Sequence, residues 1–163
     1  MPDKSLPCYN SNVLEHFLYK IPNLSEHFLL SNDDMFLNKT VLSTTFFAKD
    51  GFPIIRLNRK PFRRFRWFLR EQIFKKPHKL YSKALFNAAE LVKQKFGFFY
   101  NGLPHHNMDI YLKSDCIRVA EQIFKNEIDL TKMNHIRNAN DVQRIVYSYV
   151  CLLYTSPSPR DIS

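Results

Sequence analysis

HFLLSNDDMF, residues 27–36, joins a short apolar run to two adjacent carboxylates. The run HFLL has polar residues on both sides, a pattern typical of a buried β-strand. Open α/β sheets bind ligands beyond the carboxyl ends of their strands, which is where Asp33 and Asp34 fall. Carboxylates beside the amide of Asn32 also suit a hard divalent cation, which prefers oxygen ligands. The competing interpretation is a plain turn, because Asn-Asp-Asp is turn-prone, and the spacing by itself favours the turn.

Helical and strand-like patterns alternate around this stretch. Upstream, Asn12 is a candidate N-cap for a helix whose apolar face extends to Ile21. Downstream, residues 41–47 and 52–57 are expected to form strands around a turn at 50–51. Further helices are expected over residues 82–96, 114–124 and 140–149. This mixture predicts an α/β or α+β domain over residues 1–150.

The net charge of +9 comes from one segment. Residues 56–79 contain ten Lys or Arg against one acid, Glu71, and the rest of the chain balances at fourteen of each sign. Within this segment, residues 56–70 interleave arginines with aromatics. Such a pattern can bind single-stranded nucleic acid, lie on an anionic membrane surface or guide a polyanionic substrate. The interpretation ranked first is a solvated basic face whose aromatic side chains belong to the core.

Several protein classes are disfavoured by the composition. The sequence contains no run of about 18 apolar residues, so no membrane span is predicted. The first residues lack the basic and apolar regions of a secretory signal. The three cysteines have no CxxC spacing, which argues against a disulfide framework and a zinc site and fits a reducing, cytoplasmic compartment.

The end of the chain has an unusual composition. CLLYTSPSPRD, residues 151–161, can be back-translated in one frame to resemble a transposase sequencing adapter, and the alternative is a natural Ser/Pro tail. Under either interpretation we expect residues 151–163 to be disordered. The preceding helix is then expected to be cut, and residues 154–163 should pack against nothing.

Two further motifs carry candidate functional groups. PHHNMD, residues 104–109, places His105 and His106 in an expected loop, where a histidine could transfer protons or bind phosphate. An exposed histidine pair without a function is the better interpretation of that motif alone. In HIRNANDVQ, residues 135–143, Arg137 precedes an expected helix start and could clamp phosphate. A surface arginine beside a capping motif explains that pattern equally well.

Together and in this order, these motifs resemble one family. Residues 8–47, with an acidic helix and an apolar strand ending in Asn-Asp-Asp-Met-Phe, resemble the second conserved region of Stealth proteins. PHHNMDIYLKS and HIRNANDVQRIVYSY resemble the third. We assign region 2 to about residues 7–57 and region 3 to about residues 80–150. The family's first and fourth conserved regions have no counterpart, so Met1 resembles an internal methionine of a longer frame.

The resemblance implies a Rossmann-like nucleotide-sugar transferase core, incomplete at both ends. Stealth proteins transfer a hexose-1-phosphate or N-acetylhexosamine-1-phosphate from a nucleotide sugar to a glycan hydroxyl, forming capsule or exopolysaccharide. The implied partners are therefore a nucleotide-sugar donor and a polysaccharide acceptor, and no nucleic acid. The basic segment adds an expected peripheral contact with an anionic membrane surface at its cytoplasmic face. A nucleic-acid-binding module at residues 56–70 and a metal-dependent phosphohydrolase remain the alternatives.

The resemblance also assigns site residues. The implied catalytic residues are Glu15, Asp34, His105 or His106, and Arg137. The implied substrate-binding residues are Asn10, Asn32, Arg137 and Asp141. Asp33 and Asp34 are implied to hold a divalent cation, Mg²⁺ or Mn²⁺. The sequence departs from the family pattern at Asn12, where a histidine is common, and at Tyr9, where a phenylalanine is usual.

Overall fold

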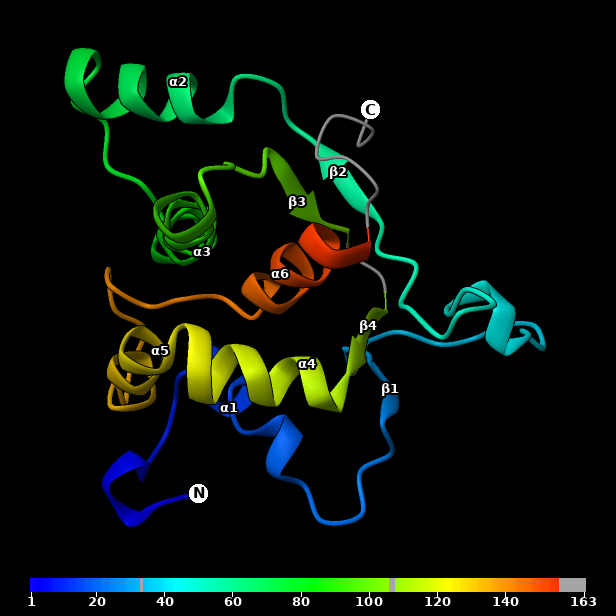
Figure 1. Ribbon diagram of the computed structural model, residues 1–163. Helices are drawn as coiled ribbons and strands as arrows, with labels where there is room; N and C mark the ends of the chain where they lie inside the picture. The colour runs from blue at the N-terminus through cyan, green and yellow to red at the C-terminus, as the bar shows by residue number, and fades with distance from the viewer. Residues whose placement is uncertain (33, 106–107, 156–163) are drawn as a thin grey trace.

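A computed structural model describes residues 1–32, 34–105 and 108–155 (Figure 1). The α-helices are α1 (Ser11–Glu15), α2 (Arg63–Phe68), α3 (Leu80–Phe96), α4 (Lys113–Arg118), α5 (Lys125–Lys132) and α6 (Ile145–Thr155). The π-helical turns η4 (Leu69–Ile73) and η5 (Val119–Ile123) extend α2 and α4. Single 3₁₀ turns are η1 (Asp3–Ser5), η2 (Leu18–Lys20) and η3 (Ser43–Thr45). The strands are β1 (His27–Leu30), β2 (Leu57–Arg59), β3 (Gly102–Pro104) and β4 (Asp109–Leu112).

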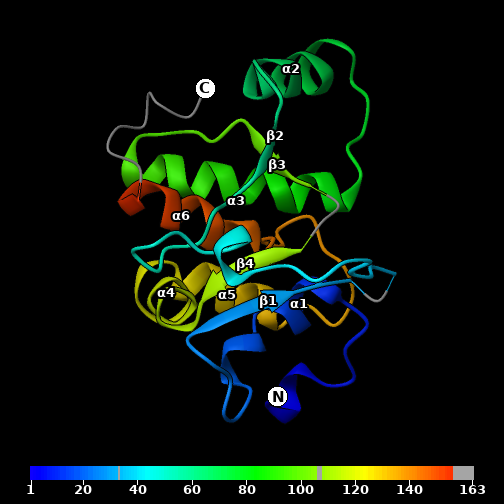
Figure 2. The ribbon, with the colours of Figure 1, turned by 90° about the vertical axis from the view of Figure 1, so that its right-hand side faces the viewer.

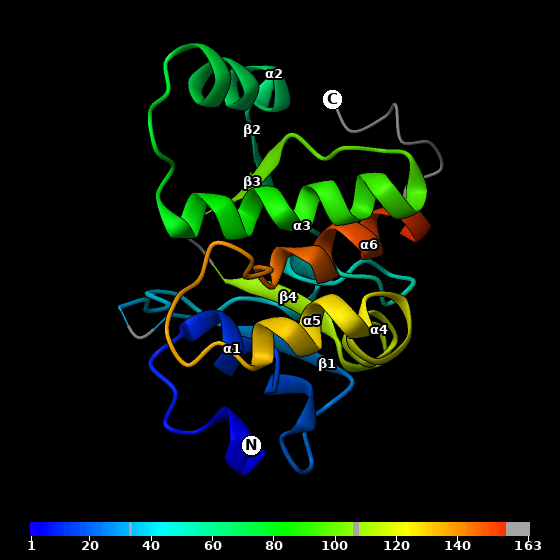
Figure 3. The ribbon, with the colours of Figure 1, turned by 90° about the vertical axis from the view of Figure 1, so that its left-hand side faces the viewer.

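Helix α6 forms the centre of the core. It lies between α3 on one side and α4 and α5 on the other (Figures 1 and 3). Its residues from Ile145 to Cys151 are all buried, as expected for a helix that is apolar on every face. The buried side of α3 packs against it, including Ala88 and Val92. This core holds the segment before α6 in a fixed position.

The strands form two small antiparallel pairs. β1 pairs with β4 from His27 opposite Leu112 to Leu30 opposite Asp109, and β2 pairs with β3. Figure 2 shows β1 and β4 side by side. The mixed helix-and-strand class is confirmed. The Rossmann-like core is not, because that core needs parallel strands and every strand pair among the described residues is antiparallel.

The strand predictions are confirmed at residues 27–30 and corrected farther along. β1 is not the buried strand that was expected, because its residues alternate between exposed and half-buried. In place of two strands, residues 41–47 contain η3, and a single bridge joins Phe47 to Pro53 across a turn at residues 48–52. Of residues 52–57, only Leu57 belongs to a strand, as the start of β2. Gly51 occupies this turn with φ +84°, a conformation that glycine adopts without strain.

Helix caps differ from the expected ones at both ends of the chain. Asn10, in place of Asn12, caps α1 by accepting a hydrogen bond from the Asn12 backbone N–H at 3.2 Å. Before α6, the Gln143 side chain accepts from the Ile145 backbone N–H at 2.6 Å, in place of a cap at Asn140. The helix expected at 82–96 is confirmed as α3, and Gly97 follows it with φ +79°.

The last described residues continue α6. Residues 151–155, which we expected to be disordered, form its final turn, and Leu152 and Leu153 pack against the core. The Tyr154 ring, expected to contact nothing, lies 4.2 Å from the Arg118 guanidinium carbon. These contacts exist because the apolar character of the helix continues past residue 150. Residues 156–163 lie outside the described part of the chain.

Candidate functional site

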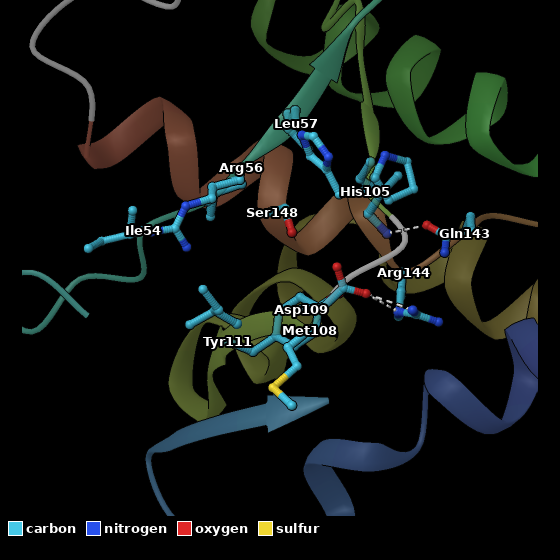
Figure 4. Close-up of a pocket in the computed structure, with 14 residues that line it drawn as sticks. Ile54, Arg56, Leu57, His105, Met108, Asp109, Tyr111, Gln143, Arg144 and Ser148 are labelled. Atoms are coloured by element: carbon cyan, nitrogen blue, oxygen red, sulfur yellow. Dashed lines mark hydrogen bonds and ion pairs between the residues drawn. The ribbon is translucent and has the colours of Figure 1, made fainter. Parts of the chain in front are cut away.

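A buried ion-pair cluster joins three elements at one side of the molecule. Arg144 donates to Asp109 Oδ2 from Nε at 2.9 Å and from Nη2 at 2.6 Å, and it donates to Glu15 Oε1 from Nη1. All three side chains are more than four-fifths buried. In Figure 4, Arg144 points toward the Asp109 carboxylate. One guanidinium therefore holds two carboxylates in place.

The fold positions each member of this cluster at the end of an element. Glu15 is the last residue of α1, Asp109 the first of β4, and Arg144 directly precedes α6. Because Asp109 pairs with Leu30, the cluster lies at the carboxyl end of β1, where the chain continues toward Asp34. The acidic stretch after β1 thus begins beside the cluster.

Glu15 is the member with unused hydrogen-bonding capacity. Its Oε2 atom is buried and has no hydrogen-bond partner among the described residues. Burial raises the pKa of Glu15, Arg144 opposes that shift, and the nearby Asp109 raises it further. A carboxylate with a raised pKa and a free oxygen is suited to accept a proton near neutral pH.

Arg137 also lies at this side of the molecule. Its Nη2 donates to Ser11 Oγ at 3.1 Å, at the start of α1, and its charge lowers the pKa of Glu15. The expected position directly before a helix is corrected, because α6 begins only at Ile145 and Arg144 precedes it. Arg137 is exposed and remains available to an anionic ligand.

His105 lines a small cavity that Asp109 and Arg144 also line (Figure 4). The cavity has a volume of about 20 Å³, enough for about one water molecule. A nucleotide sugar does not fit inside it, whereas His105 and Arg137 are exposed and can be reached by a ligand from the surface. His106 lies outside the described residues.

The expected metal site is described only in part. Asp34 and Asn32 are exposed, and the Asn32 backbone carbonyl accepts from the Met35 N–H at 3.3 Å in a turn. Asp33 lies outside the described residues. Within residues 1–32, 34–105 and 108–155, no three His, Cys, Asp or Glu side chains group closely enough to hold a metal ion.

The polar side-chain atoms of Asn10 and Asp141 are all hydrogen-bonded inside the protein. Both are buried, with exposed fractions of 0% and 1%. The Asn10 side-chain amide donates to Asp141 Oδ2 at 2.8 Å and to the Asn134 carbonyl at 3.3 Å. Their polar groups are used inside the protein, which gives both residues a structural role, and their substrate-binding role stays a prediction.

Sequence reasoning missed two members of the cluster, Asp109 and Arg144. Both stand inside quoted motifs, Asp109 at the end of PHHNMD and Arg144 directly after HIRNANDVQ. A signal was present for Arg144, since an arginine next to a very apolar helix must find a partner if it is buried. Nothing in the sequence indicated which carboxylates that partner would be.

Comparison with known proteins gives two kinds of match. Residues 1–55 match the family model for Stealth protein conserved region 2. Over 158 residues the chain is 30% identical to the capsular polysaccharide phosphotransferase fcs1 of Haemophilus influenzae, covering 91% of this chain and 39% of that protein. Over 151 residues it is 28% identical to a capsular polysaccharide phosphotransferase of Neisseria meningitidis serogroup B, covering 93% and 39%.

A shorter match is closer in sequence. Over 53 residues the chain is 51% identical to the exopolysaccharide phosphotransferase cps2G of Lactiplantibacillus plantarum, covering 32% of this chain and 16% of that protein. The chain thus spans about two-fifths of the length of the capsular relatives, at 39% of each.

Proposed function

The chain belongs to the Stealth family, and we propose that the full-length protein is a phosphotransferase of capsule or exopolysaccharide synthesis. In this proposal it transfers a hexose-1-phosphate or N-acetylhexosamine-1-phosphate from a nucleotide sugar to a hydroxyl of the growing polysaccharide. The names of the relatives support the phosphotransferase class. The sugar and the acceptor hydroxyl are extensions from the family resemblance.

The free Oε2 atom of Glu15 is the observation that carries the proposal. In the transfer step, the acceptor hydroxyl loses its proton to this oxygen as it attacks the phosphorus bonded to the sugar. A new P–O bond forms to the acceptor, and the P–O bond to the nucleotide breaks. The nucleoside monophosphate leaves with the bond's electron pair. Arg144 keeps Glu15 oriented for this proton transfer.

The donor's diphosphate requires positive charge nearby. Arg137 is exposed beside α1 and can bind phosphate oxygens. A divalent cation, Mg²⁺ or Mn²⁺, would add charge neutralisation, and the carboxylate and amide oxygens after β1 are the ligand type that such ions prefer. Asp34 would hold this ion together with Asp33. His105 or His106 would bind phosphate or move protons.

Incubation of the full-length protein with nucleotide sugars, with and without acceptor glycan, tests this function. We expect nucleoside monophosphate to be released only when the acceptor is present. Release of the same product without acceptor would instead identify a metal-dependent phosphohydrolase, which uses water in place of the glycan hydroxyl. No release from any nucleotide sugar would contradict both.

Substitution of Asp34 tests the role assigned to the segment after β1. We expect Asp34→Asn to abolish transfer while the circular dichroism spectrum stays unchanged. Asp50→Asn is a matched control, since Asp50 is an exposed carboxylate that only organises a turn by accepting from the Phe52 N–H at 3.2 Å. Normal turnover by Asp34→Asn would remove Asp34 from the mechanism.

A further inference from the structure

The helix formed by α2 and η4 exposes large apolar side chains. Phe62 is 75% exposed, Phe65 59%, Phe68 55%, Ile73 61% and Phe74 62%. α2 lies at one edge of the molecule, next to α3 (Figures 1 and 3). The sequence interpretation that was ranked first placed the aromatic side chains of residues 56–70 in the core. Most of them are at the surface instead. Clustered exposed apolar side chains mark an interaction site.

One side of α2, which carries Trp67, packs against the body of the protein. Trp67 attaches α2 to the body, with its ring stacked 3.4 Å from the His78 ring and 4.2 Å from the Phe86 ring, measured between centroids. Residues two positions apart on an α-helix point about 200° apart. Phe65, two residues before Trp67 and exposed, therefore lies on the opposite side of α2 from the Trp67 contact.

Basic residues surround this apolar face. Lys60, Arg66, Arg70, Lys75 and Lys76 are all exposed. Between residues 56 and 79 the sequence has a single acid, Glu71. Apolar side chains on the outward face of a helix, bordered by cations, match the surface of a bilayer that contains anionic lipid.

Two other polyanions fit less well. Single-stranded nucleic acid binds by stacking its bases on free aromatic faces. The Trp67 ring is already stacked between His78 and Phe86, which leaves only the smaller phenylalanine rings to stack on bases. The aliphatic Ile73 gives no advantage in binding a base or a polar glycan, whereas it gains from entering acyl chains.

We propose that the outward face of α2 and η4 docks on the surface of an anionic bilayer. Phe62, Phe65 and Ile73 enter the boundary between headgroups and acyl chains, and the surrounding lysines and arginines contact the headgroups. Trp67 stays against α3. This docking does not depend on the transfer reaction, so each can fail without the other.

Sedimentation of the full-length protein with vesicles tests the docking. We expect binding to vesicles of phosphatidylcholine with phosphatidylglycerol, and much weaker binding to phosphatidylcholine alone. Phe65→Ser should weaken binding about tenfold, because the serine loses apolar burial. Arg66→Gln and Arg70→Gln should each weaken it about fivefold.

A control variant distinguishes binding through α2 from nonspecific binding by any exposed apolar side chain. Leu130→Ser changes a side chain that is also 62% exposed but lies on α5, and it should leave vesicle binding unchanged. Circular dichroism of each variant shows whether it is folded. Equal losses in Phe65→Ser and Leu130→Ser would contradict docking through α2.

Three other results would overturn the proposal. The first is no binding to the anionic vesicles. The second is binding that falls with Arg66→Gln but not with Phe65→Ser, which would show attraction by charge alone. The third is Phe65-dependent binding of a single-stranded oligonucleotide or an anionic glycan that displaces the vesicles, which would identify a different ligand for the same face.

Discussion

Asp141 and Glu15 are both carboxylates held between the first residues of the chain and the segment before α6, but their oxygens are used differently. Both oxygens of Asp141 are occupied. Oδ1 accepts from the Asn134 amide at 2.7 Å, and Oδ2 accepts from the amides of Asn10 at 2.8 Å and Asn12 at 3.2 Å. This cluster is closed, and its role is to join distant segments.

The cluster around Glu15 is open by comparison. Arg144 occupies Oε1, while Oε2 is buried without a partner among the described residues. A buried oxygen that lacks a hydrogen bond lowers stability by about 1 to 3 kcal/mol. Folding stability therefore does not explain why this oxygen is unpaired. The difference separates a carboxylate that supports the structure from one available for chemistry.

The largest effect on activity is expected from Glu15→Gln. The amide cannot accept the acceptor's proton, so kcat of the full-length enzyme should fall about a thousandfold. Stability should change by less than about 1 kcal/mol in urea unfolding, because Arg144 keeps its two hydrogen bonds to Asp109. The matched variant Glu26→Gln alters an exposed carboxylate that bonds Ser114 and should remain active. A Glu15→Gln enzyme with normal kcat would show that Oε2 is not the proton acceptor.

Asp141→Ala should have the opposite effect, lowering stability and leaving activity unchanged. It removes the carboxylate that accepts from the amides of Asn10, Asn12 and Asn134 and should lower the free energy of unfolding by about 3 kcal/mol. Urea denaturation followed by circular dichroism measures that loss. Below the unfolding transition, kcat per folded molecule should be unchanged. A loss of kcat in fully folded protein would restore Asp141 to the substrate site.

The smallest expected effect is the change of folding stability with pH that arises from His16. Its ring is fully buried, with Nδ1 2.7 Å from the Tyr147 hydroxyl and Nε2 2.7 Å from the Val142 carbonyl. Burial lowers its pKa from 6.5 to about 4, with the charge of Lys132 acting in the same direction. The unfolded chain therefore takes up the proton first. The stability contribution of neutral His16 is complete above pH 6.5 and is lost as pH falls toward 4.

Between pH 7 and pH 5 this contribution should fall by about 2 kcal/mol. The raised pKa values of Glu15 and Asp109 act in the opposite direction, because the folded state takes up their protons first. Comparison of the wild type with His16→Gln isolates the histidine, and the variant should lose less stability over this interval by about that amount. Parallel curves of unfolding free energy against pH would contradict it.

The elements with a strong apolar period were predictable from sequence, and the clusters were not. α3 follows from its apolar spacing, and β1 follows from HFLL. Of the helix expected at residues 140–149, only 145–149 are helical, as the start of α6. The pairing of Leu30 with Asp109 joins residues far apart in the chain, and nothing local encodes it. The caps failed for a related reason, because several asparagines close together offer equivalent local patterns and tertiary contacts choose among them.

The prediction for the basic segment was wrong for a different reason. Its aromatics were expected in the core because large aromatic side chains are usually buried. In RRFRWF, however, the arginines are so closely spaced that burying the whole helix would also bury cations without enough acids to pair them. Only the side with Trp67 packs inward, where Arg64 pairs with Glu90 at 2.7 Å.

The stacking of Trp67 against α3 gives the chain an optical property. It is the single tryptophan in these 163 residues, so their indole fluorescence arises from the joint between α2 and the body. Separation of the two helices would move the indole into water and shift its emission to longer wavelength. Because a protonated imidazole quenches indole emission and the His78 ring stacks 3.4 Å away, titration of this histidine should also change the signal.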